Sequence, residues 1–127
     1  MTRTILVVDD EEDLAVTCQR LLNRRGWHVT IVGNREAALA TLARTPPPVL
    51  AIVDRHLPDG DGIDVLRAAR AIDMPVIVVT GQASRAMRRL VLEEGAAGFL
   101  GKPFSAHDLL ELVRVIVGDA DGAAPPT

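Results

Sequence analysis

The sequence Ile5-Leu6-Val7-Val8-Asp9-Asp10 decides the fold, because a short run of apolar, mostly branched residues ends abruptly in two carboxylates. An apolar run without alternation is typical of a strand buried on both faces of a parallel sheet. Residues 13–25 follow with apolar side chains at helical spacing, and Gly26 stands where such a helix would end. The segment therefore predicts a strand followed by a helix, the first unit of an α/β fold.

The same alternation recurs four more times along the chain. Further strands are predicted at 28–32, 49–53, 76–79 and 98–100, and further helices at 34–43, 63–72, 84–94 and 109–117. Helices between successive strands favour parallel pairing with right-handed crossovers. We therefore expect a doubly wound α/β domain over residues 1–117, a flavodoxin-like (βα)5 three-layer sandwich. For its sheet we take the order 2-1-3-4-5, one of the two common doubly wound orders. Residues 118–127 are expected to form a flexible tail or the start of an interdomain linker.

Length and composition exclude several classes of protein. With 127 residues, 48% of them hydrophobic, and a net charge of −3, the chain fits one globular domain. The lone Cys18 forms no internal disulfide, which excludes a cystine scaffold and favours a reducing, cytoplasmic location. No apolar run reaches the roughly 18 residues of a membrane span, so no membrane association is expected. The mild acidity argues against direct nucleic-acid binding.

Polar residues gather where the predicted strands end. Asp9 and Asp10 follow the first strand, Asp54 the third, Thr80 the fourth and Lys102 the fifth. In open α/β sheets, ligands bind beyond the carboxyl ends of the strands, and these four strands are neighbours in the expected order. The five side chains should therefore form one cluster.

The chemistry of this cluster points to phosphoryl transfer. Three carboxylates against one lysine leave a surplus of negative charge, which favours a bound cation. Oxygen ligands without Cys or His favour a hard ion, and a few carboxylates with room for water suit Mg²⁺ better than Ca²⁺. A lysine and a threonine hydroxyl beside the metal are suited to hold phosphoryl oxygens, with one aspartate as the nucleophile.

Four motifs together resemble the receiver domain of two-component response regulators, over about residues 4–117. They are Val8-Asp9-Asp10-Glu11; Asp54 with Leu57-Pro58-Asp59-Gly60-Asp61-Gly62; Val79-Thr80-Gly81; and Phe99-Leu100-Gly101-Lys102-Pro103-Phe104. The bond before Pro103 stands where the family has a cis proline. The resemblance implies a phosphorylation-dependent signalling switch, not an enzyme, that catalyses only its own phosphotransfer and autodephosphorylation.

The resemblance also implies a role for each acidic site residue. Asp54 would accept a phosphoryl group from a histidine kinase or a phosphotransfer protein. Asp10, Asp54 and the backbone carbonyl of His56 would bind Mg²⁺, and Asp9 would reach the ion through water.

The switch residues follow from the same resemblance. Thr80 and Lys102 would hold the phosphoryl oxygens, and Phe99 would turn into the space that Thr80 vacates. The surface that changes would also serve as a homodimer contact. It consists of the predicted helix 84–94, strand 98–100 and helix 109–117.

Two neighbours of the site are assigned a tuning role. His56 and Gln82 lie two positions after Asp54 and Thr80, where the family adjusts the lifetime of the phosphoryl group. The alternative for His56 is that only its backbone carbonyl acts, whatever its side chain.

Simpler interpretations apply to other polar residues. Glu11 belongs to an acidic run that we interpret as a solvated helix start. Asp59 and Asp61 stand among Pro and Gly and are interpreted as turn and helix-cap residues. Taken by itself, Phe99 is an ordinary core residue.

The helix at 84–94 carries a basic face. Arg85, Arg88 and Arg89 share that face, which is either solvated or a contact for a partner or a second copy. Met87, Leu90 and Val91 are available to the core.

Two other functions use some of the same residues. A small Mg²⁺ phosphatase resembling haloacid-dehalogenase enzymes would use Asp54 as its nucleophile. Those enzymes carry a second Asp two residues later, where this chain has His56, and 127 residues leave no room for their cap domain. A flavin-phosphate binder would need a glycine-rich loop after the first strand, where Asp9 and Asp10 would repel the phosphate.

Overall fold

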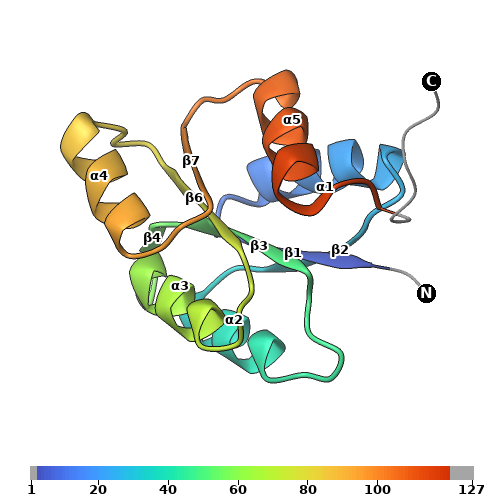
Figure 1. The fold of residues 1–127 in the computed structure, drawn as a ribbon, viewed down its shortest axis with the longest axis horizontal. Coiled ribbons are helices and arrows are strands. Elements are labelled where there is room, and N and C mark those ends of the chain that lie inside the picture. Colours follow the sequence, from blue (N-terminus) through green and yellow to red (C-terminus); the bar gives the residue numbers. More distant parts are fainter. Residues whose placement is uncertain (1–2, 121–127) are drawn as a thin grey trace.

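A computed structural model describes residues 3–120 and shows a parallel five-stranded sheet between two layers of helices (Figure 1). The sheet order is β2-β1-β3-β6-β7, which confirms the expected order of the five main strands. The strands are β1 (Thr4–Val8), β2 (His28–Val32), β3 (Leu50–Asp54), β6 (Val76–Thr80) and β7 (Gly98–Gly101). The flavodoxin-like, doubly wound fold is therefore confirmed.

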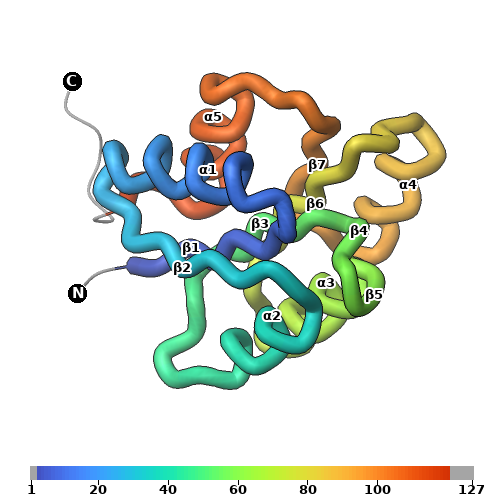
Figure 2. The backbone as a smooth tube through the Cα atoms, turned by 180° about the vertical axis from the view of Figure 1, so that it is seen from behind, coloured from blue at the N-terminus to red at the C-terminus, as the bar shows by residue number. Residues whose placement is uncertain are grey.

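The helices divide between the two faces of the sheet, as Figure 2 shows from behind. One layer holds α1 (Glu12–Arg24) and α5 (Ala106–Val117), and the other holds α2 (Arg35–Leu42), α3 (Gly62–Arg70) and α4 (Arg85–Glu93). Within residues 3–120, no helix combines the length and apolar character needed to cross a membrane.

Alternate strand residues supply two separate cores. In β1, Ile5 and Val7 pack in the core under α1 and α5, whereas Leu6 and Val8 pack in the core under α2, α3 and α4. Successive side chains of a strand point to opposite faces, so both must be apolar when helices cover both faces. This is why the apolar run at the start of the chain shows no alternation.

Side-chain caps start four of the helices. Asn34 accepts a hydrogen bond from Ala37 N–H at α2, and Ser105 accepts one from Asp108 N–H at α5. Asn and Ser are among the residues preferred directly before a helix, because a side-chain oxygen accepts from a free N–H of the first turn. Asp61, interpreted from the sequence as a turn or helix-cap residue, caps α3, and Ser84 caps α4 in the same manner.

Several details differ from the sequence-based expectation. The segment after β3 forms a small antiparallel hairpin, β4 (His56–Leu57) with β5 (Gly60–Asp61), that no pattern predicted. Strands of two residues are too short to show a period. In α4 the expectation of core contacts holds for Val91 but is wrong for Leu90, which is 40% exposed because the helix buries only a narrow side.

The first residues of the expected tail pack on the domain. Arg3 Nη1 donates a hydrogen bond to Asp119 O at 2.9 Å, and the Arg3 guanidinium lies 5.2 Å from the centre of the Trp27 ring. Ala120 is buried in the core that includes Trp27. The remainder of that tail, 121–127, lies outside the described residues.

Gly62 is a position where the fold tolerates little additional volume, because backbone atoms surround it. A Cβ atom there would lie 2.3 Å from the backbone oxygen of Asp54. We expect Gly62→Ala to lower the free energy of unfolding by about 1–3 kcal/mol, because backbone must move to admit the methyl group. Urea unfolding measures this, with Gly81→Ala as the control, since a Cβ at Gly81 meets nothing within 4 Å. Equal midpoints for the two variants would contradict the close packing of α3 on β3.

Candidate phosphoryl-transfer site

The carboxyl ends of four neighbouring strands meet at one edge of the sheet and carry predicted site residues. Asp9 follows β1, Asp54 ends β3 and Thr80 ends β6, and all three are buried. Lys102 follows β7, whose last residue, Gly101, pairs with Thr80. Parallel pairing in this order is what brings residues from distant parts of the chain to one place.

The Lys102 ammonium lies at the centre of the site. Its Nζ is 3.0 Å from Asp9 Oδ2, 3.1 Å from Asp54 Oδ2 and 2.8 Å from Glu11 Oε1. Burial lowers the pKa of Lys102, but hydrogen bonds to the three carboxylates outweigh burial and raise the pKa above its ordinary value. Lys102 therefore keeps its positive charge at neutral pH.

The two buried aspartates are held by the backbone as well as by Lys102. Asp9 Oδ1 accepts a hydrogen bond from Glu11 N–H at 2.9 Å, and Asp54 Oδ1 accepts one from His56 N–H at 3.1 Å. Burial raises the pKa of the Asp9 carboxyl, and the hydrogen bonds from Glu11 N–H and Lys102 offset this only in part. Both carboxylates are thus oriented before any ligand binds.

Three carboxylates lie close enough to share a cation. Oxygens of Asp9, Glu11 and Asp54 all lie within 4.8 Å of one another. Three negative charges against one lysine, offered by hard oxygen donors, fit a divalent cation such as Mg²⁺ or Ca²⁺. The described residues therefore include an acidic group that is able to hold a metal.

The two acidic neighbours of Asp9 take different positions. Asp10 is exposed and lies outside the group of three carboxylates, and its role as a metal ligand stays a prediction. Glu11, which we interpreted as part of a solvated helix start, does lie directly before α1 with its side chain 62% exposed, and its carboxylate also pairs with Lys102. The only signal for Glu11 in the sequence is its place in the acidic run, which does not tell which carboxylate turns inward.

The proposed switch and tuning residues lie around the same edge. Thr80 Oγ1 accepts a hydrogen bond from Gln82 N–H at 3.1 Å, and the Thr80 side chain is fully buried. Phe99 is half-buried against the core on the α2–α4 side of the sheet. The side chains of His56 and Gln82 are exposed. The peptide bond between Lys102 and Pro103 is cis, as the resemblance implied.

Arg55 is a residue near the site for which the sequence offered no motif. Its guanidinium lies 3.4 Å from the Asp61 carboxylate and contacts Met87 Sδ of α4. Its backbone N–H donates to Val79 O at 2.9 Å. The residue directly after Asp54 therefore connects the loop between β3 and α3 to α4.

Asp59, which lies later in the same loop, fixes that loop to α2. The two oxygens of Asp59 accept hydrogen bonds from the backbone N–H groups of Arg35 and Glu36, at 2.6 and 3.0 Å. These bonds, the one from Arg35 first, lower the pKa of Asp59. Asp59 was interpreted as a turn or helix-cap residue, and it caps α2, whose first residue, Arg35, precedes it by 24 positions in the chain.

Comparison with known protein families identifies the class of protein. The family described as the response regulator receiver domain matches residues 5–114, from β1 into α5. The chain therefore belongs to the receiver domains of two-component response regulators, which are signalling proteins. This confirms the resemblance stated from the four motifs, and the phosphatase alternative is not favoured.

Individual relatives agree with this assignment. The sensory transduction protein RegX3 of Mycolicibacterium smegmatis is 36% identical over 115 residues, which are 90% of this chain and 50% of that protein. The alkaline phosphatase synthesis transcriptional regulatory protein PhoP of Bacillus subtilis is 35% identical, over 98% of this chain and 52% of that protein. The chain thus spans about half the length of the curated relatives it matches.

Solved structures agree as well. A CheY-like response regulator receiver domain protein from Methanospirillum hungatei has a TM-score of 0.82 at 31% identity, over 91% of this chain and 93% of that chain. A response regulator from Burkholderia pseudomallei, solved with a phosphorylated aspartic acid, calcium ion and citrate, has a TM-score of 0.77 at 32% identity. That match covers 87% of this chain and 65% of that chain.

The raised pKa of Asp9 leads to a prediction on stability. Because its buried carboxylate is unfavourable, Asp9→Asn should raise the free energy of unfolding at pH 7 in metal-free buffer by about 1 kcal/mol. The gain should disappear as the pH falls below the ordinary Asp value of 3.8, where Asp9 is protonated in the folded and unfolded chain alike.

Chemical denaturation across this pH range measures the effect. Asp13→Asn is the control, because Asp13 is exposed on the first turn of α1. If Asp9→Asn were less stable than the parent at pH 7, the contact with Lys102 would outweigh the free-energy cost of burying the Asp9 carboxylate.

Proposed function

We propose that the chain is a phosphorylation-dependent switch in which Asp54 accepts a phosphoryl group from a histidine kinase or a phosphotransfer protein. The observation that carries this proposal is the position of Lys102 Nζ, 3.1 Å from Asp54 Oδ2 at the open edge of the sheet. The phosphorylated aspartic acid of the Burkholderia pseudomallei response regulator supports it.

The proposed transfer is a single displacement at phosphorus. An Asp54 carboxylate oxygen forms a new P–O bond while the P–N bond of the donor phosphohistidine breaks, and the imidazole leaves with the electron pair. Lys102 stabilises the negative charge that collects on the phosphoryl oxygens. Hydrolysis of the acyl phosphate by water then returns Asp54 to its carboxylate form, which is the autodephosphorylation of the domain.

Mg²⁺ is the proposed cofactor of both reactions. Asp10, Asp54 and the His56 carbonyl are the proposed direct ligands, with Asp9 acting through water. When bound, the ion neutralises charge between the carboxylates and the incoming phosphoryl group. Glu11 is an additional carboxylate within reach, since its oxygen lies in the same group as those of Asp9 and Asp54.

The switch itself depends on Thr80 and Phe99. Thr80 Oγ1 accepts from Gln82 N–H, so its own proton remains available to donate to a phosphoryl oxygen. Movement of Thr80 toward that oxygen leaves space for Phe99 to turn inward. A coupling of about 1–3 kcal/mol is enough to change the surface formed by α4, β7 and α5. Self-association through this surface stays a prediction, as does the cytoplasmic location.

Phosphorylation is tested by intact mass after incubation with acetyl phosphate. With Mg²⁺ we expect one phosphoryl adduct on the parent chain, because Asp54 is the nucleophile, and none without Mg²⁺. Asp54→Asn should show no adduct, whereas Asp64→Asn, an aspartate on α3 outside the site, should show the parental adduct. An adduct that persists in Asp54→Asn would overturn the proposal, and beryllium fluoride binding distinguishes rapid hydrolysis from a failure to react.

The lifetime of the adduct tests the two tuning residues. The side chains of His56 and Gln82 are exposed, and their proposed role is to accept a hydrogen bond from an attacking water. His56→Ala and Gln82→Ala should each slow dephosphorylation several-fold, well below the roughly 100-fold effect of removing a full general base. The decay of the adduct measured by mass gives the rate, and an unchanged rate in a variant would remove that side chain from the role.

A further inference from the structure

The Lys102 ammonium has no hydrogen-bond donor left for an incoming phosphoryl group. A lysine ammonium offers three N–H donors. Three carboxylate oxygens, from Glu11, Asp9 and Asp54, lie between 2.8 and 3.1 Å from Lys102 Nζ. A phosphoryl oxygen that approaches Lys102 must therefore replace one of these carboxylates.

Two of the three carboxylates are firmly held. The side chains of Asp9 and Asp54 are each 7% exposed, and the second oxygen of each accepts a backbone N–H, from Glu11 and His56 respectively. A buried carboxylate that loses its cation is poorly solvated, which is costly in free energy. Asp54 is also the proposed nucleophile, and it keeps its charge until the P–O bond forms.

Glu11 is held much less firmly than the two aspartates. Its side chain is 62% exposed, and within residues 3–120 its only hydrogen bond is the one from Lys102. Glu11 stands directly before α1, yet its side chain accepts no hydrogen bond from the first turn of that helix. Glu11 and Lys102 also line an open cavity of about 550 Å³. Water can solvate a carboxylate released there, so breaking this contact costs little.

We propose that Glu11 is a positioning residue that occupies Lys102 in the unphosphorylated domain and releases it when a phosphoryl group arrives. Both groups are anionic and use the same N–H donor, so they compete for Lys102. The strength of the Glu11 contact then sets how readily Asp54 is phosphorylated. This inference rests on the proposed function, because it takes Lys102 as the residue that holds the phosphoryl oxygens.

A purely metal-binding role for Glu11 predicts a different result. Its oxygen lies within 4.8 Å of those of Asp9 and Asp54, close enough to share a cation with them. If Glu11 served only to hold Mg²⁺, its replacement would weaken the binding of Mg²⁺ and would not strengthen the binding of a phosphoryl mimic. Measuring the two affinities separately distinguishes the two roles.

The test uses beryllium fluoride as the phosphoryl mimic, at a Mg²⁺ concentration that saturates each variant. Glu11→Gln removes the charge that competes for Lys102. Glu11→Asp keeps the charge, but its side chain is one methylene shorter and is suited to cap α1 instead. Titration calorimetry should show that both variants bind beryllium fluoride about three- to tenfold more tightly than the parent chain, because a donor of Lys102 is free.

Glu12→Gln is the matched control. It changes the net charge by the same amount as Glu11→Gln, and Glu12 is exposed on the first turn of α1 without an ion pair among residues 3–120. Its affinity for beryllium fluoride should stay within about twofold of the parent, since an exposed charge in water interacts weakly.

The outcomes separate this inference from the proposed function. Parental or weaker binding in both Glu11 variants would overturn the inference alone. Tighter binding in Glu11→Gln without any change in Glu11→Asp would also overturn it, because charge and not the contact with Lys102 would then be responsible. Absence of binding to the parent and to every variant would contradict the proposed function, and the inference with it.

Discussion

The contact of the Lys102 ammonium with Asp9 and Asp54 is the interaction on which the site depends. It joins the ends of β1, β3 and β7, and its geometry requires the parallel order of the sheet. The same contact leaves a surplus of negative charge, because three carboxylates share one ammonium. A site with surplus negative charge is suited to take up a divalent cation, whose positive charge offsets that of the carboxylates and of an incoming phosphoryl group.

The elements around Asp54 differ in how firmly they are held. The loop between β3 and α3 is fixed to α2 by the carboxylate of Asp59 and folded into the small hairpin of β4 and β5. In contrast, Val91 is the one fully buried residue of α4. An element with few buried apolar contacts can be displaced at a small cost in free energy. A signal from Asp54 should therefore change the position of α4 before that of α2 or α3.

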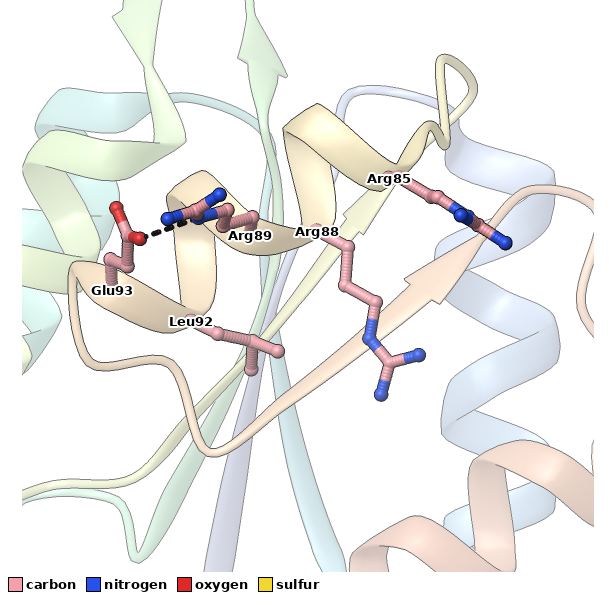
Figure 3. Close-up of a pocket in the computed structure, with 5 residues that line it drawn as sticks. All are labelled: Arg85, Arg88, Arg89, Leu92 and Glu93. Carbon is pink, nitrogen blue, oxygen red and sulfur yellow. Dashed lines mark hydrogen bonds and ion pairs between the residues drawn. The ribbon is translucent and has the colours of Figure 1, made fainter.

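The two sides of α4 have different surroundings. On its inner side, Met87 contacts the Arg55 guanidinium, which also pairs with Asp61 at the start of α3. On its outer side, Arg85 and Arg88 face solvent (Figure 3). The helix thus lies between Arg55, which directly follows Asp54, and a surface exposed to solvent, which is the arrangement that transmission of a signal from Asp54 through α4 would require.

The sequence by itself determined the fold class and the residues at the strand ends, and it favoured one of the two common strand orders, which the structure then confirmed. Non-alternating apolar runs such as Ile5 to Val8 report burial on both faces, and a side chain that follows such a run must lie at the carboxyl edge of the sheet. Only the tertiary structure decided which acid beside Asp9 contacts Lys102, because Asp10 and Glu11 are both exposed carboxylates that differ in direction and not in chemistry. It also decided the contacts of Asp59 with α2 and of Arg55 with α4. Such contacts join residues far apart in the chain, and local pattern holds no information on the distance between them.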